Sequence, residues 1–334
     1  MKILADRFGR IHTYLRISVT DKCNLNCIYC NPADSAFRGE LSGSILSYEE
    51  LVRLIKIFVT ELGIKKIRLT GGEPLVRKNI GNFFRMLKEV KDNFPFELGL
   101  TTNGILLNDK IELLKEYGLD KINISLDTLR SERFIAVTGN DNIDKVINAI
   151  DKAEEAGYSP VKINTVIMKG INDNEIPDFI EFVKDRNLNI RFIEYMPFTS
   201  NGWSEKVFIS YKEIKSIVER NYTLVEIDNS KHNVSRDFRI KGHTGTVSFI
   251  SSISDHFCDG CNRLRVTASG NLKLCLFSPV HSEIKLKDYL RDNKIPDEKI
   301  ADVILSSLQY KEFKHPELDE LLQMDKNNML RIGG

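Results

Sequence analysis

Short apolar runs alternate with longer segments of helical spacing through the first part of the chain. The apolar runs that fit strands cover residues 15–19, 66–69, 97–101, 121–125, 161–166 and 189–194. Apolar residues at helical spacing cover residues 51–62, 80–90, 109–116, 143–153 and 175–187. Six strand–helix steps in series predict an α/β fold with a parallel sheet. Because six units fall short of a closed eight-stranded barrel, we expect a partial (βα)6 TIM-like barrel.

The alternation stops after Pro197, and a mixed pattern follows. One helix is predicted over residues 211–220, and two more over residues 285–291 and 296–308. Strand-like pieces cover residues 238–240, 247–250, 264–267 and 272–276, the last two joined by a hairpin turn at Ala268-Ser269-Gly270-Asn271. We therefore expect two parts. Residues 1–198 form the partial barrel, and residues 199–334 form a C-terminal α+β extension.

Three closely spaced cysteines follow the first predicted strand. Cys23, Cys27 and Cys30 read C-x3-C-x2-C. Three thiolates can hold three irons of a four-iron cluster and leave the fourth iron open for a substrate. Structural zinc prefers four protein ligands, and no fourth Cys or His follows nearby. A redox dithiol or an incomplete zinc site is the alternative.

A second group of three cysteines lies in the predicted extension. Cys258, Cys261 and Cys275 read C-x2-C-x13-C, again with no obvious fourth ligand. One interpretation is a second four-iron cluster with an open iron. The other is a zinc site that His256 or His281 completes.

Several cations are predicted to face the inside of the barrel. Strand alternation places one set on the inner faces, opposite the apolar residues that face the helices: Arg16, Lys66, Arg68, Lys162 and Arg191. Arg263 and Arg265 share one face of a strand beside the second cysteine group. Several cations in one cavity indicate a polyanionic ligand such as a triphosphate. The alternatives are ion pairs with Glu73, Glu97 or Glu194 for the first set, and ordinary surface charges for the last two.

Polar or glycine-rich sequence follows almost every predicted barrel strand. These segments are Gly71-Gly72-Glu73-Pro74, Thr101-Thr102-Asn103-Gly104, Ser125-Leu126-Asp127 and Glu194-Tyr195-Met196-Pro197. Because the carboxyl ends of parallel strands carry the chemistry of such barrels, we expect these segments to surround one site. Gly72 leaves room for a ligand near the backbone, or it only makes a tight turn. Met196 is a contact residue or simple core filler.

Composition narrows the class of protein. The net charge of +1 over 334 residues gives no basic field for nucleic acid. The chain contains no apolar run of membrane-spanning length, and residues 1–10 lack the apolar region of a signal peptide. Two groups of three cysteines suit metal binding in a reducing compartment better than disulfides. We expect a cytoplasmic protein that binds neither nucleic acid nor membrane.

The motifs resemble a known family. The C-x3-C-x2-C spacing is the signature of the radical S-adenosylmethionine (SAM) superfamily. Over essentially its whole length the chain resembles GTP 3′,8-cyclase, also called molybdenum cofactor biosynthesis protein A. The matching segments include residues 15–21, 67–74, 100–104, 123–127 and 191–196, the second cysteine group and the terminal glycines. The chain departs from the family at Asn31, where Met is usual, and in detail between Ala33 and Ser47.

The resemblance implies two [4Fe-4S] clusters and SAM. The first three cysteines would hold the cluster that cleaves SAM, and the second three a cluster whose open iron anchors guanine. The positions that match SAM contacts are Tyr29, Gly72, Ser125 and Met196. Those that match GTP contacts are Arg16, Arg68, Thr101, Lys162, Arg263 and Arg265, to which we add Lys66, Arg191 and Leu264. Gly333 and Gly334 end a tail that reaches the active site in the family, so we place both, with the first cysteines and the two arginines, among the catalytic residues.

The resemblance also implies the reaction. A 5′-deoxyadenosyl radical takes the ribose 3′ hydrogen of GTP, and the carbon radical attacks guanine C8. The product is (8S)-3′,8-cyclo-7,8-dihydroguanosine 5′-triphosphate, an early precursor of the molybdenum cofactor. Expected partners are a flavodoxin-like or similar electron donor and the next pathway enzyme, cyclic pyranopterin monophosphate synthase. A monomer and a homodimer both remain open. The alternatives are another radical SAM enzyme, such as a peptide maturase, and a non-enzymatic zinc module.

Overall fold

The computed structural model describes residues 2–30, 45–198, 201–227, 234–324 and 329–333. Its first six strands are β1 (Tyr14–Ser18), β2 (Lys66–Thr70), β3 (Glu97–Thr102), β4 (Lys121–Ser125), β5 (Val161–Ile167) and β6 (Leu188–Glu194). The helices that accompany them are α1 (Tyr48–Thr60), α2 (Ile80–Asn93), α3 (Ile111–Glu116), α4 (Ser131–Thr138), α5 (Ile143–Glu155) and α6 (Ile176–Val183). All six predicted strands are present, and the partial barrel is confirmed.

The rest of the chain adds further strands and helices. The strands are β7 (Leu224–Glu226), β8 (Arg236–Ile240), β9 (Thr246–Ile250), β10 (Arg263–Val266), β11 (Asn271–Lys273) and β12 (Ile284–Lys285). The helices are α7 (Tyr211–Glu219), α8 (Lys287–Arg291), α9 (Asp297–Ser307), α10 (Leu318–Gln323) and α11 (Met329–Ile332). The predicted strand over 272–276 is shorter in the structure, because the chain leaves the sheet before Cys275.

All the strands listed above belong to one sheet. Their order is β12-β11-β10-β1-β2-β3-β4-β5-β6-β9-β8-β7. The six barrel strands are parallel to one another, β10 adds in parallel to the β1 edge, and β9 adds in parallel to the β6 edge. The extension therefore lengthens the barrel sheet at both edges, and brings the second cysteine group next to the first strand.

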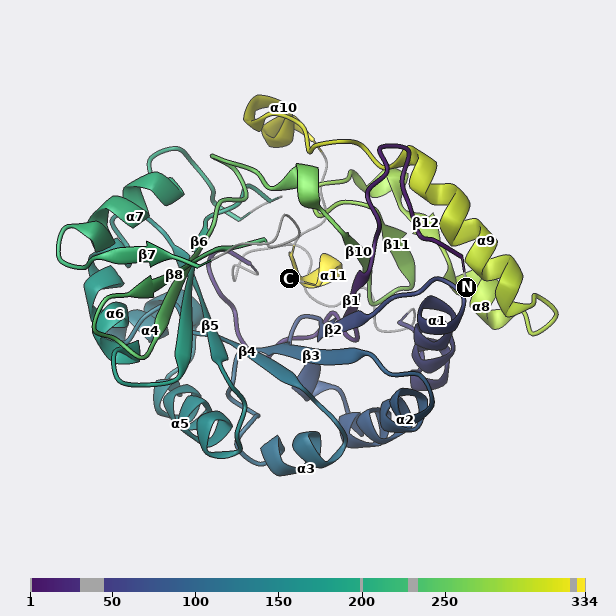
Figure 1. Ribbon diagram of the computed structural model, residues 1–334, viewed down its shortest axis with the longest axis horizontal. Coiled ribbons are helices and arrows are strands. Elements are labelled where there is room, and N and C mark those ends of the chain that lie inside the picture. Colours follow the sequence, from purple (N-terminus) through teal and green to yellow (C-terminus); the bar gives the residue numbers. More distant parts are fainter. Residues whose placement is uncertain (1, 31–44, 199–200, 228–233, 325–328, 334) are drawn as a thin grey trace.

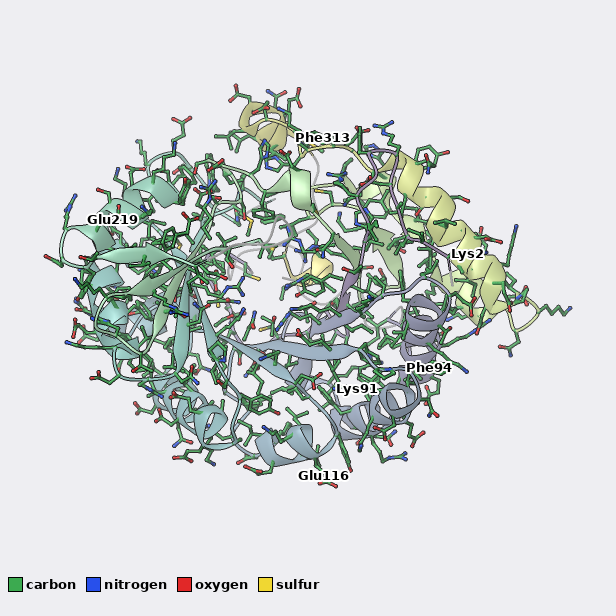
Figure 2. All side chains as sticks on the ribbon, viewed as in Figure 1. Lys2, Lys91, Phe94, Glu116, Glu219 and Phe313 are labelled. Carbon is green, nitrogen blue, oxygen red and sulfur yellow. The ribbon has the colours of Figure 1, made fainter. Side chains whose placement is uncertain are left out.

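The curved sheet is covered by helices on its outer face (Figure 1). Ile17 of β1 and Ile67 of β2 are fully buried in the apolar layer between sheet and helices. Burying such side chains stabilises the fold by roughly 1.5–3 kcal/mol each. Charged side chains such as Glu116 and Glu219 lie on the outer rim (Figure 2). The α11 helix and the C-terminal end lie near the centre of the ring of strands (Figure 1).

The start of α1 illustrates how the sequence sets an element boundary. The Ser47 side chain accepts a hydrogen bond from the Glu50 backbone N–H at 3.1 Å, and the Glu50 carboxylate accepts one from the Ser47 N–H at 2.6 Å. This capping box satisfies two of the free amide donors at the helix start. Over the residues that the structure describes, no helix is long and apolar enough to cross a membrane.

Candidate active site

Both cysteine groups line one cavity inside the barrel, of about 280 Å³. All six cysteines contribute to its wall: Cys23, Cys27, Cys30, Cys258, Cys261 and Cys275. The first three follow β1, and the others flank β10 and β11, of which β10 lies beside β1 in the sheet. Two motifs that are more than 200 residues apart in sequence therefore face a common space.

The glycine pair after β2 packs against the loop that carries the first cysteines. The Gly72 N–H donates to the Thr20 carbonyl and the Glu73 N–H to the Lys22 carbonyl, each at 2.8 Å. A Cβ atom at Gly72 would lie 2.4 Å from the Lys22 carbonyl oxygen. Only glycine permits this approach of two backbones. Gly72 thus positions the cysteine loop, and it also lines the cavity.

Glu73 is a buried hub between the strand ends. Its carboxylate accepts hydrogen bonds from the Leu75 N–H at 3.0 Å, the Thr102 hydroxyl at 2.8 Å and the Asn103 N–H at 2.7 Å. Burial raises the pKa of Glu73 to about 7, although these hydrogen bonds lower it. The Asn103 side chain then donates to Asn24 at 2.9 Å. Glu73 therefore ties the ends of β2 and β3 to the first cysteine loop.

Tyr29 and Asp127 form the next contact along this wall. The Tyr29 hydroxyl donates to Asp127 Oδ2 at 2.7 Å, and the Val166 N–H donates to Asp127 Oδ1 at 2.9 Å. Burial raises the pKa of Asp127 to about 6. Burial, then the nearby Asp127 charge, raises the pKa of the Tyr29 hydroxyl well above its usual value. The hydroxyl therefore stays protonated and the contact fixes the Tyr29 ring.

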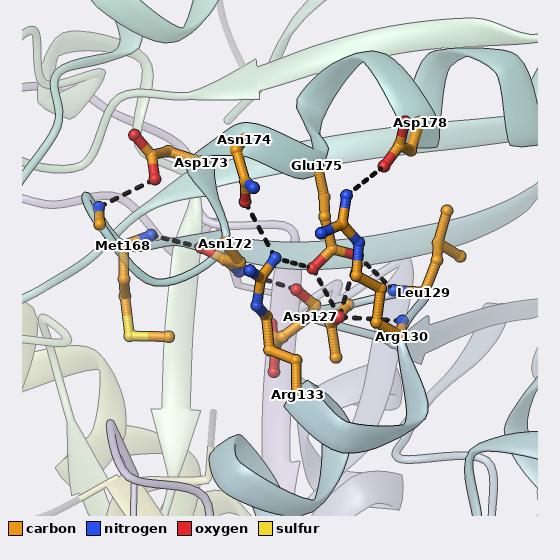
Figure 3. Close-up of polar contacts among 12 residues, drawn as sticks. Asp127, Leu129, Arg130, Arg133, Met168, Asn172, Asp173, Asn174, Glu175 and Asp178 are labelled. Atoms are coloured by element: carbon orange, nitrogen blue, oxygen red, sulfur yellow. Dashed lines mark hydrogen bonds and ion pairs between the residues drawn. The ribbon is translucent and has the colours of Figure 1, made fainter.

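A buried polar network joins the loop that carries Asp127 to Asn172 and Glu175 (Figure 3). The Asn172 side chain donates to the Asp127 carbonyl at 2.7 Å and to the Val166 carbonyl at 2.8 Å. The fully buried Glu175 accepts from the Leu129 N–H at 2.8 Å and pairs with Arg133. The loop after β4 is thereby fixed on both sides.

Asn201 bridges two segments of the wall. Its side-chain Nδ2 donates to the Tyr29 carbonyl at 3.2 Å and to the Met196 carbonyl at 2.8 Å. The Trp203 indole N–H donates to the Tyr195 carbonyl at 2.9 Å. The segment after β6 therefore holds the first cysteine loop against the end of that strand.

The first cysteines are half-buried in the cavity wall. Burial raises the pKa of Cys23 to about 11, that of Cys30 to about 12, and that of Cys27 well above its usual value. Without a bound metal these thiols are neutral at pH 7. Loading them with iron must therefore release protons.

The second cysteine group has positively charged neighbours, Arg263 and Lys311. Burial raises the pKa of Cys261, but the charges of Arg263 and Lys311 outweigh burial and lower it to about 7. Lys311 also donates to the carbonyl of Leu274, next to Cys275, and Arg10 donates to the Cys258 carbonyl at 2.8 Å. The thiolate of Cys261 is therefore more accessible than those of the first group, whereas burial raises the pKa of Cys258.

The possible fourth ligands of the second group lie in different places. His256 lines the cavity beside these cysteines, whereas His281 does not. Among the described residues, no three His, Cys, Asp or Glu side chains form a group that could hold a single metal ion. The donor set of each group is three thiols, two of which share one turn, at Cys27 and Cys30 and at Cys258 and Cys261. Three thiols are the set that a four-iron cluster with an open iron uses.

Four of the predicted cations line the cavity: Arg16, Arg191, Arg263 and Arg265. Arg265 is 6% exposed, and its Nη1 donates to the Gly333 carbonyl at 2.9 Å. The Arg263 guanidinium lies over the Phe257 ring at 4.7 Å. Burial and the neighbouring Arg16 and Arg263 charges lower the pKa of Arg265. Cations held this close repel one another, and an anion in the cavity relieves that repulsion.

The remaining predicted cations do not line the cavity. Lys66 forms an ion pair with Glu97 at 2.8 Å, which is one of the alternatives considered from the sequence. Arg68 donates to the Tyr14 hydroxyl at 2.8 Å and to the Leu100 carbonyl at 3.0 Å. Burial, then the Arg191 charge, lowers the pKa of Lys162 to about 8. Leu264 is fully buried in the apolar core, on the other face of β10 from the two arginines.

The predicted SAM contacts and Thr101 all line the cavity, the former being Tyr29, Gly72, Ser125 and Met196. The structure adds polar wall residues that the sequence analysis did not single out: Asn123, Asn164 and His315. Isolated Asn residues carry no motif, so only their place on inward-facing strand positions could have found them.

The tail enters the barrel. Leu330 and Ile332 are buried, and Gly333 follows with a φ of +80°. A Cβ atom at Gly333 would lie 2.6 Å from the Thr70 hydroxyl oxygen and 2.7 Å from the Ser18 Cβ. Only glycine fits against the ends of β1 and β2 here. Gly334 lies outside the described residues.

Comparison with known proteins first gives the class. Residues 17–183 match the family model of the radical SAM superfamily, and residues 188–317 match the model described as Molybdenum Cofactor Synthesis C. The crystal structure of Streptococcus suis SuiB superimposes with a TM-score of 0.63 at 15% identity, covering 91% of this chain and 69% of that chain. At this identity the likeness shows the fold alone. The site therefore belongs to a radical SAM protein, a class that uses a [4Fe-4S] cluster and SAM.

Closer relatives give the family. The mitochondrial GTP 3′,8-cyclase of Arabidopsis thaliana is 45% identical, covering 99% of this chain and 84% of that protein. A GTP 3′,8-cyclase of Listeria monocytogenes is 41% identical and covers 100% of both. Human molybdenum cofactor biosynthesis protein 1 is 41% identical, and the chain spans 51% of its length. The chain belongs to the GTP 3′,8-cyclase family.

Proposed function

We propose that this chain cyclises GTP to (8S)-3′,8-cyclo-7,8-dihydroguanosine 5′-triphosphate in molybdenum cofactor biosynthesis. The observation that carries the proposal is the shared cavity, whose wall contains both three-cysteine groups and four arginines. A SAM-cleaving site alone needs one cysteine group. A second group with adjacent cations adds a place for a substrate that has both a metal-binding base and several negative charges.

The first site would bind SAM. Cys23, Cys27 and Cys30 would hold the cluster, which when bound supplies the electron that splits the SAM sulfonium. Ser125 and Met196 are the strand-end residues of this site, and Tyr29 lies on the cysteine loop. The contacts of Asp127 and Asn201 hold Tyr29 in place.

The second site would bind GTP. Cys258, Cys261 and Cys275 would hold a second [4Fe-4S] cluster, and a set of three thiols that line the same cavity supports it. Arg16, Arg263 and Arg265 are buried or half-buried cations beside this group, as phosphate binding requires. Thr101 and Arg191 lie further along the wall. Arg68 and Lys162 do not line the cavity. They would attract the triphosphate through their charge, or their side chains would turn toward the bound nucleotide.

The chain would act together with other proteins. We infer an electron donor of the flavodoxin type for the first cluster, and cyclic pyranopterin monophosphate synthase as the enzyme that takes the product. In this division of labour, residues 1–198 make the radical and supply part of the substrate wall, and residues 199–334 add the second cysteine group with Arg263 and Arg265. The six cysteines are free thiols, which suits a reducing compartment.

Anaerobic reconstitution tests the proposal. The chain is loaded with iron and sulfide, incubated with GTP, SAM and dithionite, and the nucleotide product is identified by mass spectrometry and NMR. We expect about eight irons and no zinc per chain, and one cyclised nucleotide for each 5′-deoxyadenosine. Formation of 5′-deoxyadenosine while GTP is recovered unchanged would refute the assigned substrate.

A further inference from the structure

We propose that Asn123 is a substrate-binding residue that accepts a hydrogen bond from a ribose hydroxyl of the nucleotide. Asn123 lies on β4, is 3% exposed, and contributes to the cavity wall. Its Oδ1 atom has no hydrogen-bond partner among the described residues. A buried amide oxygen left without a donor costs about 1–3 kcal/mol, so a bound donor is the natural partner. This inference rests on the proposed function.

The neighbouring strand repeats the pattern. Thr101 of β3 is the register partner of Asn123, and its hydroxyl oxygen also has no partner among the residues described. Thr101 lines the same cavity. Two adjacent strands thus present unpaired oxygens side by side to the cavity, which a structural role in the core does not require.

The strand register places Asn123 between the two proposed sites. Arg16 pairs in register with Arg265 and Arg68, forming a row of cations across β10, β1 and β2. Two residues further along the strands, the next inward row holds Ser18, Thr70, Thr101, Asn123 and Lys162. Ser125 lies in the row after that, which continues to Asn164 and Arg191, at the end of the cavity where the proposed SAM site lies. Successive inward rows are about 7 Å apart.

The chemistry of GTP fits this order of rows. The sugar is bonded through C5′ to the triphosphate, which the row of arginines attracts. The hydrogen to be removed sits on C3′, which must face SAM beside Ser125. The ribose therefore lies at the level of the row between them, which is the row of Asn123.

The missing partner must be a donor. An amide oxygen accepts hydrogen bonds only, and phosphate oxygens at neutral pH are acceptors as well. Triphosphate thus cannot satisfy Asn123 Oδ1. Ribose hydroxyls are donors at the required level, whereas the guanine donors belong at the second cysteine group. Asn123 would thereby hold the sugar in one orientation toward the radical.

A comparison of GTP with its 2′-deoxy and 3′-deoxy analogues tests this assignment. Equilibrium dialysis measures the affinity of the reconstituted protein for each nucleotide, and product analysis measures the cyclised nucleotide formed from GTP per 5′-deoxyadenosine. We expect the wild type to bind at least one deoxynucleotide about tenfold more weakly than GTP. In Asn123→Ala this difference falls to about twofold or less, and more SAM is cleaved without product.

Two variants control for other causes. Asn123→Asp keeps an acceptor oxygen, so it retains discrimination against the deoxynucleotide even though its charge weakens every triphosphate. Asn187→Ala removes an exposed amide that donates to the Ser159 hydroxyl at 2.6 Å, and should behave as wild type. Asn123→Ser replaces the alanine variant if circular dichroism shows that the latter does not fold.

The outcomes separate the two proposals. Wild-type discrimination in Asn123→Ala, with GTP still cyclised by the wild type, would overturn the role of Asn123 alone. Absence of cyclised product from the wild type would overturn the proposed function. A wild type that binds GTP and both deoxynucleotides equally would show that no residue reads the ribose hydroxyls, and would overturn the inference as well.

Discussion

Arg265 Nη1 donates a hydrogen bond to the backbone carbonyl of Gly333 at 2.9 Å. The bond joins a buried cation of the substrate wall to the end of the chain, 68 residues later in sequence. The Gly333 N–H donates in turn to the Met329 carbonyl at 3.0 Å, so that the tail is itself ordered. The position of this arginine therefore depends on a tail that enters the barrel and packs against Ser18 of β1 and Thr70 of β2.

Replacing Gly333 by Ala should damage cyclisation. The new Cβ would meet the Thr70 hydroxyl and the Ser18 Cβ, and the φ of +80° disfavours any side chain. We expect cyclised product to fall about 10- to 100-fold, because small displacements of reacting groups are costly, while iron content and SAM cleavage persist.

Gly242→Ala is the matched control for this change. Gly242 has a φ of +83° and nothing within 4 Å of its Cβ position, so it carries the same backbone strain without the intrusion. It should lose about 1 kcal/mol of stability and keep its turnover. Normal cyclisation by Gly333→Ala would show that the tail has no part in catalysis. Deletion of Gly333 and Gly334 should reproduce the loss.

Arg265→Ala should weaken GTP binding far more than guanosine binding. A hydrogen bond from a buried guanidinium to phosphate contributes about 1.5–3 kcal/mol, which corresponds to roughly 10- to 100-fold in affinity. Equilibrium dialysis with both ligands measures the difference. Equal losses for GTP and guanosine would place Arg265 away from the phosphates.

The two cysteine groups should fail in different ways. We expect Cys27→Ala to abolish SAM cleavage, because the first cluster loses a ligand. Cys275→Ala should retain uncoupled SAM cleavage and lose GTP conversion. Anaerobic assays of 5′-deoxyadenosine and of cyclised nucleotide distinguish the two. Full cyclisation by Cys275→Ala would exclude a second cluster that anchors the substrate.

Asn201→Asp should weaken SAM binding. The substitution places a carboxylate oxygen where Nδ2 now donates to the Tyr29 and Met196 carbonyls, so that two attractions become repulsions. We expect the KM for SAM to rise about tenfold with GTP affinity unchanged. Asn93→Asp is the control, since this exposed amide also donates to a backbone carbonyl, that of Glu89 at 2.8 Å. An unchanged KM for SAM in Asn201→Asp would mean that the bridge does not shape the SAM site.

Local pattern predicted the barrel strands well. The β4 strand runs over Lys121–Ser125 as predicted, because Ile122 and Ile124 alternate with polar residues in a short run. The α4 helix over Ser131–Thr138 was not predicted, since only three of its residues are buried and no helical stripe stands out. The predicted helix over 175–187 is shorter, because α6 ends at Val183 and the chain turns toward β6.

The pairing of strands that are far apart in the chain could not be predicted from the sequence pattern. Nothing local to β9 or β10 indicates that they pair in parallel with β6 and β1, since such pairing depends on contacts far apart in the chain. The same limit applies to the site. The two cysteine motifs were evident from their spacing, and Asp127 lies in a predicted site segment. The hydrogen bonds by which Asp127 and Asn201 hold Tyr29 could not be predicted from any motif. The ambiguity at Lys66 is resolved by register, which places Glu97 beside it.

Transfer of deuterium from GTP to SAM tests the central claim most directly. GTP labelled with deuterium at ribose C3′ is incubated anaerobically with the reconstituted chain, SAM and dithionite, and the 5′-deoxyadenosine is analysed by mass spectrometry. The proposed arrangement of a SAM site and a GTP site in one cavity predicts one deuterium per 5′-deoxyadenosine, together with cyclised nucleotide. Unlabelled 5′-deoxyadenosine formed alongside unchanged labelled GTP would contradict it.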